Sequence, residues 1–246
     1  MLFLPDHVNI ILFYAPEVEL PLPRRDSRAV HLLDVLRRRP GDSFDAGLID
    51  GPRGKGTLVA INRETLSLSF VWAGPPPPLS PITLLIGLPR PQTARAILRE
   101  TTALGVAALH FVRTEKGEAS YARSTLWQSG EWKNHLIAGA AQAFCTRLPE
   151  MTHGHSLVEC ISALPAANAR LALDNYESPG ALSAFDPAGR KSAILAVGAE
   201  RGWSAPEREL LRQSGFTFAH LGPRVLRTET ACIAAVTLLK AMLGLI

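Results

Sequence analysis

The sequence predicts an α/β protein in which a small β-barrel domain precedes a domain built on a mostly parallel β-sheet, and three observations lead to this prediction. Before residue 75, short apolar runs alternate with glycine-rich turns, which is typical of a small barrel. After residue 78, strand-length and helix-length apolar segments alternate, which favours a parallel sheet covered on both faces. Between them, Gly74 is followed by four prolines, which continue neither a helix nor a central strand. We therefore predict domains at residues 1–74 and 75–246.

In the first domain, each strand is predicted from a short apolar run bounded by turn residues. The turn at residues 50–54, which reads DGPRG, separates two of these runs. One segment differs, because apolar residues recur at helical spacing over residues 28–39 before Pro40 and Gly41 end it; we expect a helix there. The predicted strands are residues 8–14, 44–49, 57–61 and 66–72.

In the second domain, amphipathic helical segments alternate with short apolar ones. Ser204 and Glu207 form a capping box that predicts the start of a helix, and Gly215 is expected to end it. Residues 230–243 are apolar nearly all round, so this last helix should be buried. The other predicted helices are residues 93–104 and 124–144, and the predicted strands are residues 82–88, 106–112, 171–174, 193–198 and 216–221.

Composition narrows the classes of function. The 26 basic residues exceed the 22 acidic ones, giving a net charge of +4, which is compatible with a polyanionic partner without requiring one. Cys145, Cys160 and Cys232 form neither a CxxC pair nor a zinc-like cluster, so we expect reduced thiols, a cytoplasmic protein and no metal site. No apolar run approaches the roughly 20 residues of a membrane helix, and the apolar start is typical of a strand rather than a signal peptide.

Glycine-rich turns follow two of the predicted strands, at the ends where ligands bind in open α/β sheets. Residues 198–202 read GAERG, and Gly222 and Pro223 follow the next strand. Glycine lets the backbone approach a ligand closely. Neither turn matches a dinucleotide or P-loop fingerprint, which disfavours phosphate cradling. Ordinary tight turns are an equally open interpretation of the glycines alone.

A polar cluster, residues 224–230, opens the apolar final helix. One interpretation is a helix cap, in which Thr228 caps the helix and Glu229 complements its positive end. That interpretation does not explain why Arg224 and Arg227 crowd a turn next to the glycine-rich loops. A role in binding or catalysis is therefore the other interpretation.

Much of the chain resembles one known family. Residues 196–239, AVGAERGWSAPERELLRQSGFTFAHLGPRVLRTETACIAAVTLL, closely resemble the C-terminal signature of the RsmE-like ribosomal RNA (uridine-N3) methyltransferases of the SPOUT superfamily, and LGPRVLRTETA is the most specific part. The resemblance continues upstream in residues 88–112, LPRPQTARAILRETTALGVAALHFV, and in residues 28–50, which begin with RAVHLLDVLRRRPGD. The matching segments follow one another in the family's order.

This resemblance implies the fold, the cofactor and the partners. The fold would be a trefoil-knotted, parallel-sheet SPOUT methyltransferase domain preceded by a PUA-like β-barrel that helps to hold RNA. The cofactor would be S-adenosylmethionine, bound in a bent shape by the knotted loops. The enzyme would be a homodimer whose active site is completed across the interface. Its substrate would be N3 of a uridine in small-subunit (16S) ribosomal RNA.

The resemblance also assigns site residues by position. Arg227 would stabilise the negative charge on the uracil oxygens, and Glu229 would orient that arginine or accept the N3 proton. Ala199 and Arg201 depart from the family's usual GPEGG loop, and residues 140–151, AAQAFCTRLPEM, depart from its long-helix motif, of which Gln142 and Arg147 preserve part. The residues expected to contact the cofactor are Leu173, Gly198, Ala199, Glu200, Gly202, Leu221, Gly222, Pro223, Val225, Leu226 and Arg227.

An arginine-rich stretch over residues 24–39 is the best N-terminal candidate for RNA binding. A solvated helix face is the ordinary interpretation of such a charge run, but with the family resemblance we expect phosphate contacts that weaken with salt. His31 fits either a capping or an RNA role, and Trp127 and Trp132 fit base stacking less well than core or dimer packing. The expected RNA contacts are Arg25, Arg28, His31, Arg37 and Arg38.

Two alternatives stay open at this point. The same fold could serve another nucleotide of ribosomal or transfer RNA, because a fold does not fix a function. The chain could also be a catalytically silent RNA-binding protein of ribosome assembly, for which the replacements at Ala199 and Arg201 are the only support.

Overall fold

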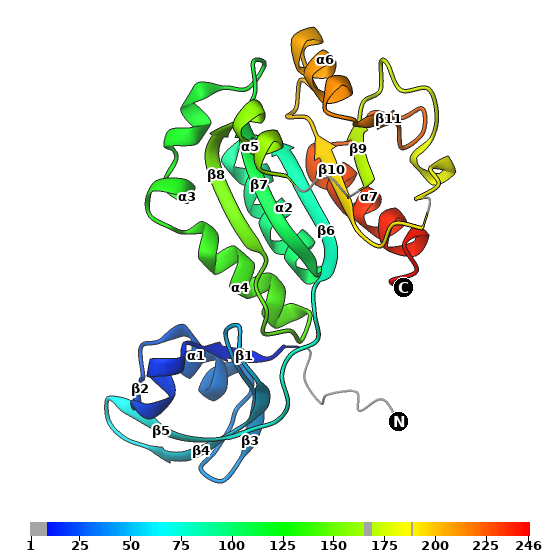
Figure 1. Cartoon of the computed structure of the whole chain (residues 1–246). Coiled ribbons are helices and arrows are strands. Elements are labelled where there is room, and N and C mark those ends of the chain that lie inside the picture. Colours follow the sequence, from blue (N-terminus) through cyan, green and yellow to red (C-terminus); the bar gives the residue numbers. More distant parts are fainter. Residues whose placement is uncertain (1–8, 165–168, 188) are drawn as a thin grey trace. The chain divides into compact units, whose positions relative to one another are not determined.

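The computed structural model describes residues 9–164, 169–187 and 189–246, and its residues form two compact units. The first unit comprises Met1–Pro78 with Ala140–Leu148, and the second comprises Leu79–Gly139 with Pro149–Ile246 (Figure 1). Residues 1–8 lie outside the described residues, and they include the first residue of the strand expected at 8–14.

The first unit is built on a curled five-stranded sheet (Figure 1). β1 pairs with β3 in parallel, and the other neighbours are antiparallel. Its core is formed by apolar side chains that include Phe13, Leu32, Phe44 and Leu58. The order across the sheet is β1 (Ile11–Phe13), β3 (Ser43–Leu48), β4 (Arg53–Ile61), β5 (Thr65–Trp72) and β2 (Leu22–Pro23), and a 3₁₀ turn, η1 (Ala15–Glu19), follows β1.

Two details of this unit differ from the sequence-based expectations. The helix expected over residues 28–39 is shorter: α1 (Ser27–Val30) passes into one turn of π-helix, η2 (His31–Val35). Arg37 has a left-handed backbone with φ of 52°, which ends the helix before the expected stop at Pro40. In addition, β4 begins at Arg53, inside the segment expected to be a turn.

The second unit contains a six-stranded sheet in which all neighbouring strands are parallel. Its order is β11 (Thr217–Ala219), β9 (Ala169–Leu173), β10 (Ala193–Val197), β6 (Ser80–Gly87), β7 (Val106–Arg113) and β8 (Glu150–Ser156). The helices are α2 (Pro91–Ala103), α3 (Thr125–Gln128), α4 (Trp132–Gln142), α5 (Leu157–Ala163), α6 (Ala205–Gln213) and α7 (Thr228–Met242), with 3₁₀ turns η3 (Ala119–Arg123) and η4 (Leu182–Ala184).

Helices cover both faces of this sheet, which explains why its central strands are apolar throughout. All five residues of β10 are buried. Residues of α5 and α6, including Ile161 and Leu211, share one core cluster with Ile194 and Ala196 of β10. α2 and α7 pack against each other, and α7 also packs against β10 (Figure 1). The predicted mixed α/β architecture with a parallel sheet is therefore confirmed.

The helix ends test three sequence-based expectations. Ser204 Oγ accepts from the Glu207 backbone at 3.2 Å while Glu207 Oε2 accepts from the Ser204 backbone at 2.8 Å, which confirms the capping box. The single helix expected at residues 124–144 is wrong, because Gly130, with φ of 76°, separates α3 from α4. The cap proposed for Thr228 is also wrong, because Arg227 occupies the N-cap position and Thr228 is the first helical residue.

Candidate functional site

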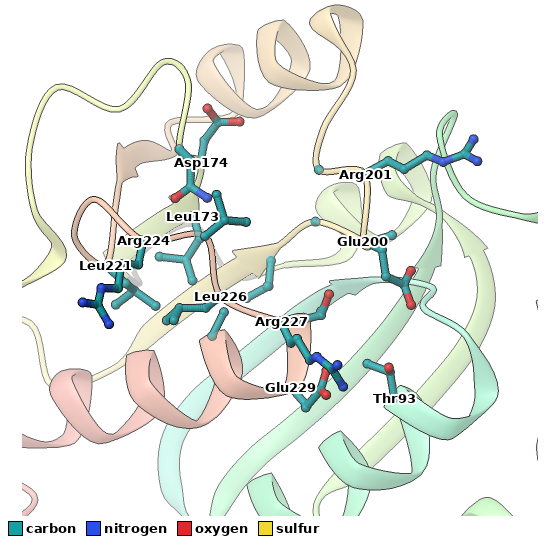
Figure 2. Close-up of a pocket in the computed structure, with 18 of the residues that line it drawn as sticks. Thr93, Leu173, Asp174, Glu200, Arg201, Leu221, Arg224, Leu226, Arg227 and Glu229 are labelled. Atoms are coloured by element: carbon teal, nitrogen blue, oxygen red, sulfur yellow. The ribbon is translucent and has the colours of Figure 1, made fainter.

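A cavity of about 360 Å³ lies in the second unit, at the carboxyl ends of β9 and β10 and at the first turns of α2 and α7 (Figure 2). This is the edge at which open α/β sheets bind their ligands. Four separate segments of the chain form its wall. They contribute Arg90 and Thr93; Leu173, Asp174, Asn175 and Tyr176; Val197, Gly198, Ala199, Glu200, Arg201 and Gly202; and Leu221, Arg224, Val225, Leu226, Arg227, Thr228, Glu229 and Ala231.

The structure brings most of the residues expected to contact a cofactor into this one cavity, although they come from three loops. Gly222 and Pro223 are not among the lining residues. The Gly222 backbone instead donates to Nδ1 of His220 at 3.0 Å. The expected catalytic residue Glu229 also lines the cavity. The expected cofactor residues that line it are Leu173, Gly198, Ala199, Glu200, Gly202, Leu221, Val225, Leu226 and Arg227.

Sequence reasoning missed two groups of lining residues. Arg90 and Thr93 follow β6, and Asp174 to Tyr176 follow β9. The first group follows the predicted strand at residues 82–88, and the second begins at the last residue of the predicted strand at residues 171–174. The rule that ligands bind at strand ends, which singled out the glycine loops, would therefore also have found them. They were missed because neither segment carries the glycines that drew attention to residues 198–202.

The first glycine loop, residues 198–202, is folded too tightly for larger residues. The Gly202 backbone donates to the Ala199 carbonyl at 2.8 Å, and Gly202 has a left-handed φ of 63°. A Cβ on Gly198 would lie 2.9 Å from the Gly202 Cα. Beneath the loop, a Cβ on Gly87 would lie 2.5 Å from the Ala199 backbone nitrogen. Backbone, rather than side chains, therefore sets the shape of this wall.

Glu200 connects this loop to the start of α2. Its Oε1 accepts from the Arg90 backbone nitrogen at 2.9 Å and from Arg90 Nε at 3.4 Å. Arg90 is the N-cap residue of α2 and provides no side-chain cap of its own. The carboxylate of Glu200 thus satisfies a free N–H group at the positive end of that helix.

Arg227 and Glu229 lie at the start of α7, on the side of the cavity that Thr93 also lines (Figure 2). Within the described part of the chain, no hydrogen bond or ion pair joins the two side chains, and Arg227 is exposed. Burial raises the pKa of the Cys232 thiol, one turn further along α7, to about 12, and the negative charge of Glu229 adds to this effect. Because Arg227 is exposed and, among the described residues, no hydrogen bond or ion pair with Glu229 holds it, its guanidinium is available to a ligand.

The residues expected to bind RNA occupy different environments in the first unit. Arg25 and Arg37 are exposed, whereas His31 and Arg38 are half-buried. Arg28 is half-buried and donates to Glu17 at 2.7 Å, to Asp26 at 2.8 Å and to the Leu12 carbonyl at 3.3 Å. Its guanidinium also lies 4.9 Å from the centre of the Phe13 ring. These contacts hold the Arg28 guanidinium in place within the first unit.

Replacing Arg28 by methionine is expected to lower the free energy of unfolding by roughly 2 kcal/mol at pH 7, because two carboxylates lose their charged donor. Hydrogen bonds from Arg28 lower the pKa of Glu17 and of Asp26 below their ordinary values of 4.5 and 3.8. The stabilisation is therefore complete above about pH 4.5 and is lost as the pH falls through the lowered pKa values. Denaturant unfolding of both proteins from pH 7 to pH 3 measures this convergence.

Arg25→Met serves as the matched control, because Arg25 is exposed and makes no ion pair among the described residues. It should leave the unfolding free energy within about 0.5 kcal/mol of wild type. An Arg28 variant as stable as the Arg25 variant at pH 7 would show that the ion pairs contribute nothing.

The described residues contain no group of three or more His, Cys, Asp or Glu side chains placed to hold a metal ion. No helix among them combines the length and the hydropathy needed to span a membrane.

Comparisons with known proteins agree with this geometry. The family model of the RNA methyltransferase domain matches residues 75–240. The chain is 35% identical over 245 residues to ribosomal RNA small subunit methyltransferase E of Treponema pallidum, covering 95% of this chain and 91% of that relative. It is 28% identical over 228 residues to ribosomal RNA small subunit methyltransferase E 1 of Borreliella burgdorferi, covering 93% and 95% of the two chains.

Solved structures share the fold over nearly the whole chain. A probable rRNA-methyltransferase from Porphyromonas gingivalis superposes with a TM-score of 0.78 at 23% identity, over 96% of this chain and 99% of that one. A ribosomal RNA small subunit methyltransferase E from Neisseria gonorrhoeae, bound to S-adenosyl methionine, gives a TM-score of 0.73 at 23% identity over 95% and 98%.

Together, the matched domain and the cavity at the carboxyl edge of the sheet define an RNA methyltransferase. More specifically, the similarity along almost the full length of the Treponema relative shows that the chain belongs to the RsmE-like family of ribosomal RNA methyltransferases. The family predicted from LGPRVLRTETA and the upstream motifs is confirmed.

Proposed function

We propose that this protein transfers the methyl group of S-adenosylmethionine to N3 of a uridine in small-subunit (16S) ribosomal RNA. The single observation that carries the proposal is the cavity itself, where the loops assigned to the cofactor by resemblance converge beside Arg227 and Glu229. The names of the Treponema and Borreliella relatives support the RNA substrate. The cofactor bound to the Neisseria structure supports the choice of methyl donor.

The residues present fit this cofactor. Leu173, Leu221 and Leu226 give the cavity apolar walls suited to a nucleobase, and the close approach at Gly198 lets backbone groups meet it. A volume of about 360 Å³ is sufficient for a folded, nucleoside-sized molecule. When bound, the cofactor supplies a methyl group carried on a positively charged sulfur.

The protein's own residues would act on the uridine. N3 carries a proton, which must leave before its electron pair can attack, and the negative charge then spreads over O2 and O4. Arg227 would donate hydrogen bonds to one of these oxygens, a role supported by its exposure at the cavity and by the absence of a hydrogen bond or ion pair with Glu229 among the described residues. Glu229, in the first turn of α7, would orient Arg227 once RNA is bound, or would accept the N3 proton.

We also propose the finer features that the resemblance implies. Residues 1–74 would form a PUA-like RNA-binding domain, supported by the curled sheet of the first unit, and residues 75–246 would form a trefoil-knotted SPOUT domain. The protein would act in the cytoplasm as a homodimer. Exposed apolar side chains at Val225 beside the cavity and at Ile246 support a partner surface. The proposed RNA contacts are Arg25, Arg28, His31, Arg37 and Arg38, of which Arg28 also donates a hydrogen bond to Glu17.

Methylation of small ribosomal subunits that lack this modification tests the proposal. Purified protein is incubated with these subunits and labelled S-adenosylmethionine, and the RNA is then digested for nucleoside mass spectrometry. We expect a new 3-methyluridine. Transfer to a different nucleoside would instead indicate another RNA target, and the absence of cofactor binding would indicate a catalytically silent RNA-binding protein. Isolated 16S RNA, run in parallel, shows whether the assembled subunit is required.

A further inference from the structure

Tyr176 combines two properties that the proposed chemistry does not use. It lines the cavity, yet the residue is 81% exposed. A large aromatic side chain in that position gains little from burial within its own chain. It follows β9 in the short segment from Asp174 to Glu177, of which Asp174, Asn175 and Tyr176 form one rim of the cavity.

The backbone of this segment is held by one buried carboxylate. Oδ1 of Asp174 accepts from the Tyr176 backbone nitrogen at 2.7 Å and from the Glu177 backbone nitrogen at 2.8 Å. Oδ2 of Asp174 accepts from Arg208 Nε at 2.7 Å. Asp174 is 6% exposed and Arg208 is 7% exposed, so both charges are removed from water. Such a pair is costly to bury unless its geometry is well satisfied, as it is here.

Further contacts connect the same segment to α6. Arg208 Nη1 lies 3.6 Å from Glu177 Oε1, and its guanidinium lies 5.5 Å from the centre of the Tyr176 ring. Glu177 also pairs with Arg212, whose guanidinium lies 5.1 Å from the Phe218 ring of β11. The segment is therefore braced before any ligand arrives, although its aromatic ring is largely exposed.

Three arginines that line the cavity indicate which kind of ligand the Tyr176 ring would contact. Arg201, Arg224 and Arg227 line the cavity, and none makes an ion pair within the described part of the chain. An exposed aromatic ring that lines the same cavity as unpaired cations is the combination that binds single-stranded RNA, in which bases stack and phosphates are neutralised. The adenine of the cofactor is better matched by the apolar wall of Leu173 and Leu226 than by an exposed rim.

We propose that Tyr176 stacks on a nucleobase of the RNA substrate at the rim of the cavity, and that the buried Asp174–Arg208 pair positions it. This inference rests on the proposed function, because it assigns an RNA contact to the same site. A braced tyrosine loses little side-chain freedom on binding, so stacking on it is efficient.

The first test compares Tyr176→Ala with Tyr176→Phe in steady-state methylation of small ribosomal subunits. Loss of the ring should raise the KM for RNA about tenfold, the effect of losing one stacked base. Phenylalanine keeps the ring and should restore a KM within about twofold of wild type. The Kd for S-adenosylmethionine should be unchanged in both variants. Val158→Ala, an exposed apolar truncation on α5, is the matched control and should resemble wild type.

The second test concerns positioning by Arg208. Arg208→Lys keeps the charge but loses the planar fork that reaches Asp174 and Glu177 together. It should raise the KM for RNA while leaving kcat nearly unchanged. In a Tyr176→Ala background, the same change should add nothing further to KM, because the ring it positions is gone. A purely stabilising role would instead give equal effects in both backgrounds.

The outcomes separate this inference from the proposed function. If wild type methylates the subunits but Tyr176→Ala retains a normal KM for RNA, the stacking role is wrong. A weaker cofactor Kd with a normal KM for RNA would also overturn it, by assigning the ring to adenine. If wild type transfers no methyl group, the proposed function fails; filter binding of RNA to wild type and to both Tyr176 variants then decides the stacking role, and equal affinities overturn it.

Discussion

Replacing Arg227 by alanine should lower the single-turnover rate of methyl transfer by roughly 10²–10³-fold, the usual effect of removing one donor that stabilises developing charge. Arg227 is the N-cap residue of α7, is exposed at the cavity and is not paired with Glu229. In the proposed reaction, its guanidinium would therefore meet the negative charge that spreads over the uracil oxygens. The measurement is rapid-quench methylation with enzyme in excess over ribosomal subunits, together with the Kd of the cofactor.

Two variants sharpen this prediction. Arg227→Lys retains the positive charge without the planar fork, so it should recover part of the rate. Arg123→Ala removes an exposed arginine from η3, away from the cavity lining, and should leave the rate unchanged. A near-normal rate for Arg227→Ala with normal cofactor binding would remove Arg227 from the chemistry.

The second large effect is expected from Gly87→Ala. A Cβ at Gly87 would lie 2.5 Å from the Ala199 backbone nitrogen and 3.2 Å from the Gly198 carbonyl carbon, so the first glycine loop must move. Because backbone atoms cannot rotate away as a side chain can, we expect cofactor affinity to fall by more than about tenfold. Overpacking should also cost roughly 1–3 kcal/mol of stability. Calorimetric titration with S-adenosylmethionine measures the first effect, and denaturant unfolding the second.

Gly180→Ala is the matched control for this substitution. A Cβ at Gly180 has nothing within 4 Å, and Gly180 does not line the cavity. The same added methyl group should therefore leave cofactor affinity unchanged. If Gly87→Ala binds the cofactor as tightly as Gly180→Ala does, the position of the Ala199 loop does not limit binding.

The parts of the fold that could be predicted from sequence are those whose signals are local. β10 is buried on both faces, and its continuous apolar run predicted a strand over nearly the right residues. The capping box of Ser204 and Glu207 fixed the start of α6 within one residue. The glycine loop and the arginines at 224 and 227 were found because their residue types are unusual next to strand ends.

The parts that were missed depend on distant neighbours. β8, with the sequence EMTHGHS, is mostly exposed at the edge of the sheet and shows no apolar alternation; its pairing with β7 alone makes it a strand. Tyr176 follows a predicted strand end but belongs to no motif, and the contact between Asp174 and Arg208, 34 residues apart, that holds its segment is not visible in the sequence. The break at Gly130 likewise interrupts a helical pattern that sequence periodicity carries through.

The segments that line the cavity are spread along the chain, so the cavity forms only late in synthesis of the protein. Arg90 is the first lining residue and Ala231 the last, in a chain of 246 residues. Domains fold as units while translation proceeds from the N-terminus, so the first unit's strands emerge from the ribosome long before the cavity can exist. If the cavity holds the cofactor as proposed, a nascent chain has no site for it until α7 has been made. Binding of S-adenosylmethionine would report the completion of folding, and proteins truncated before α7 would lack that signal.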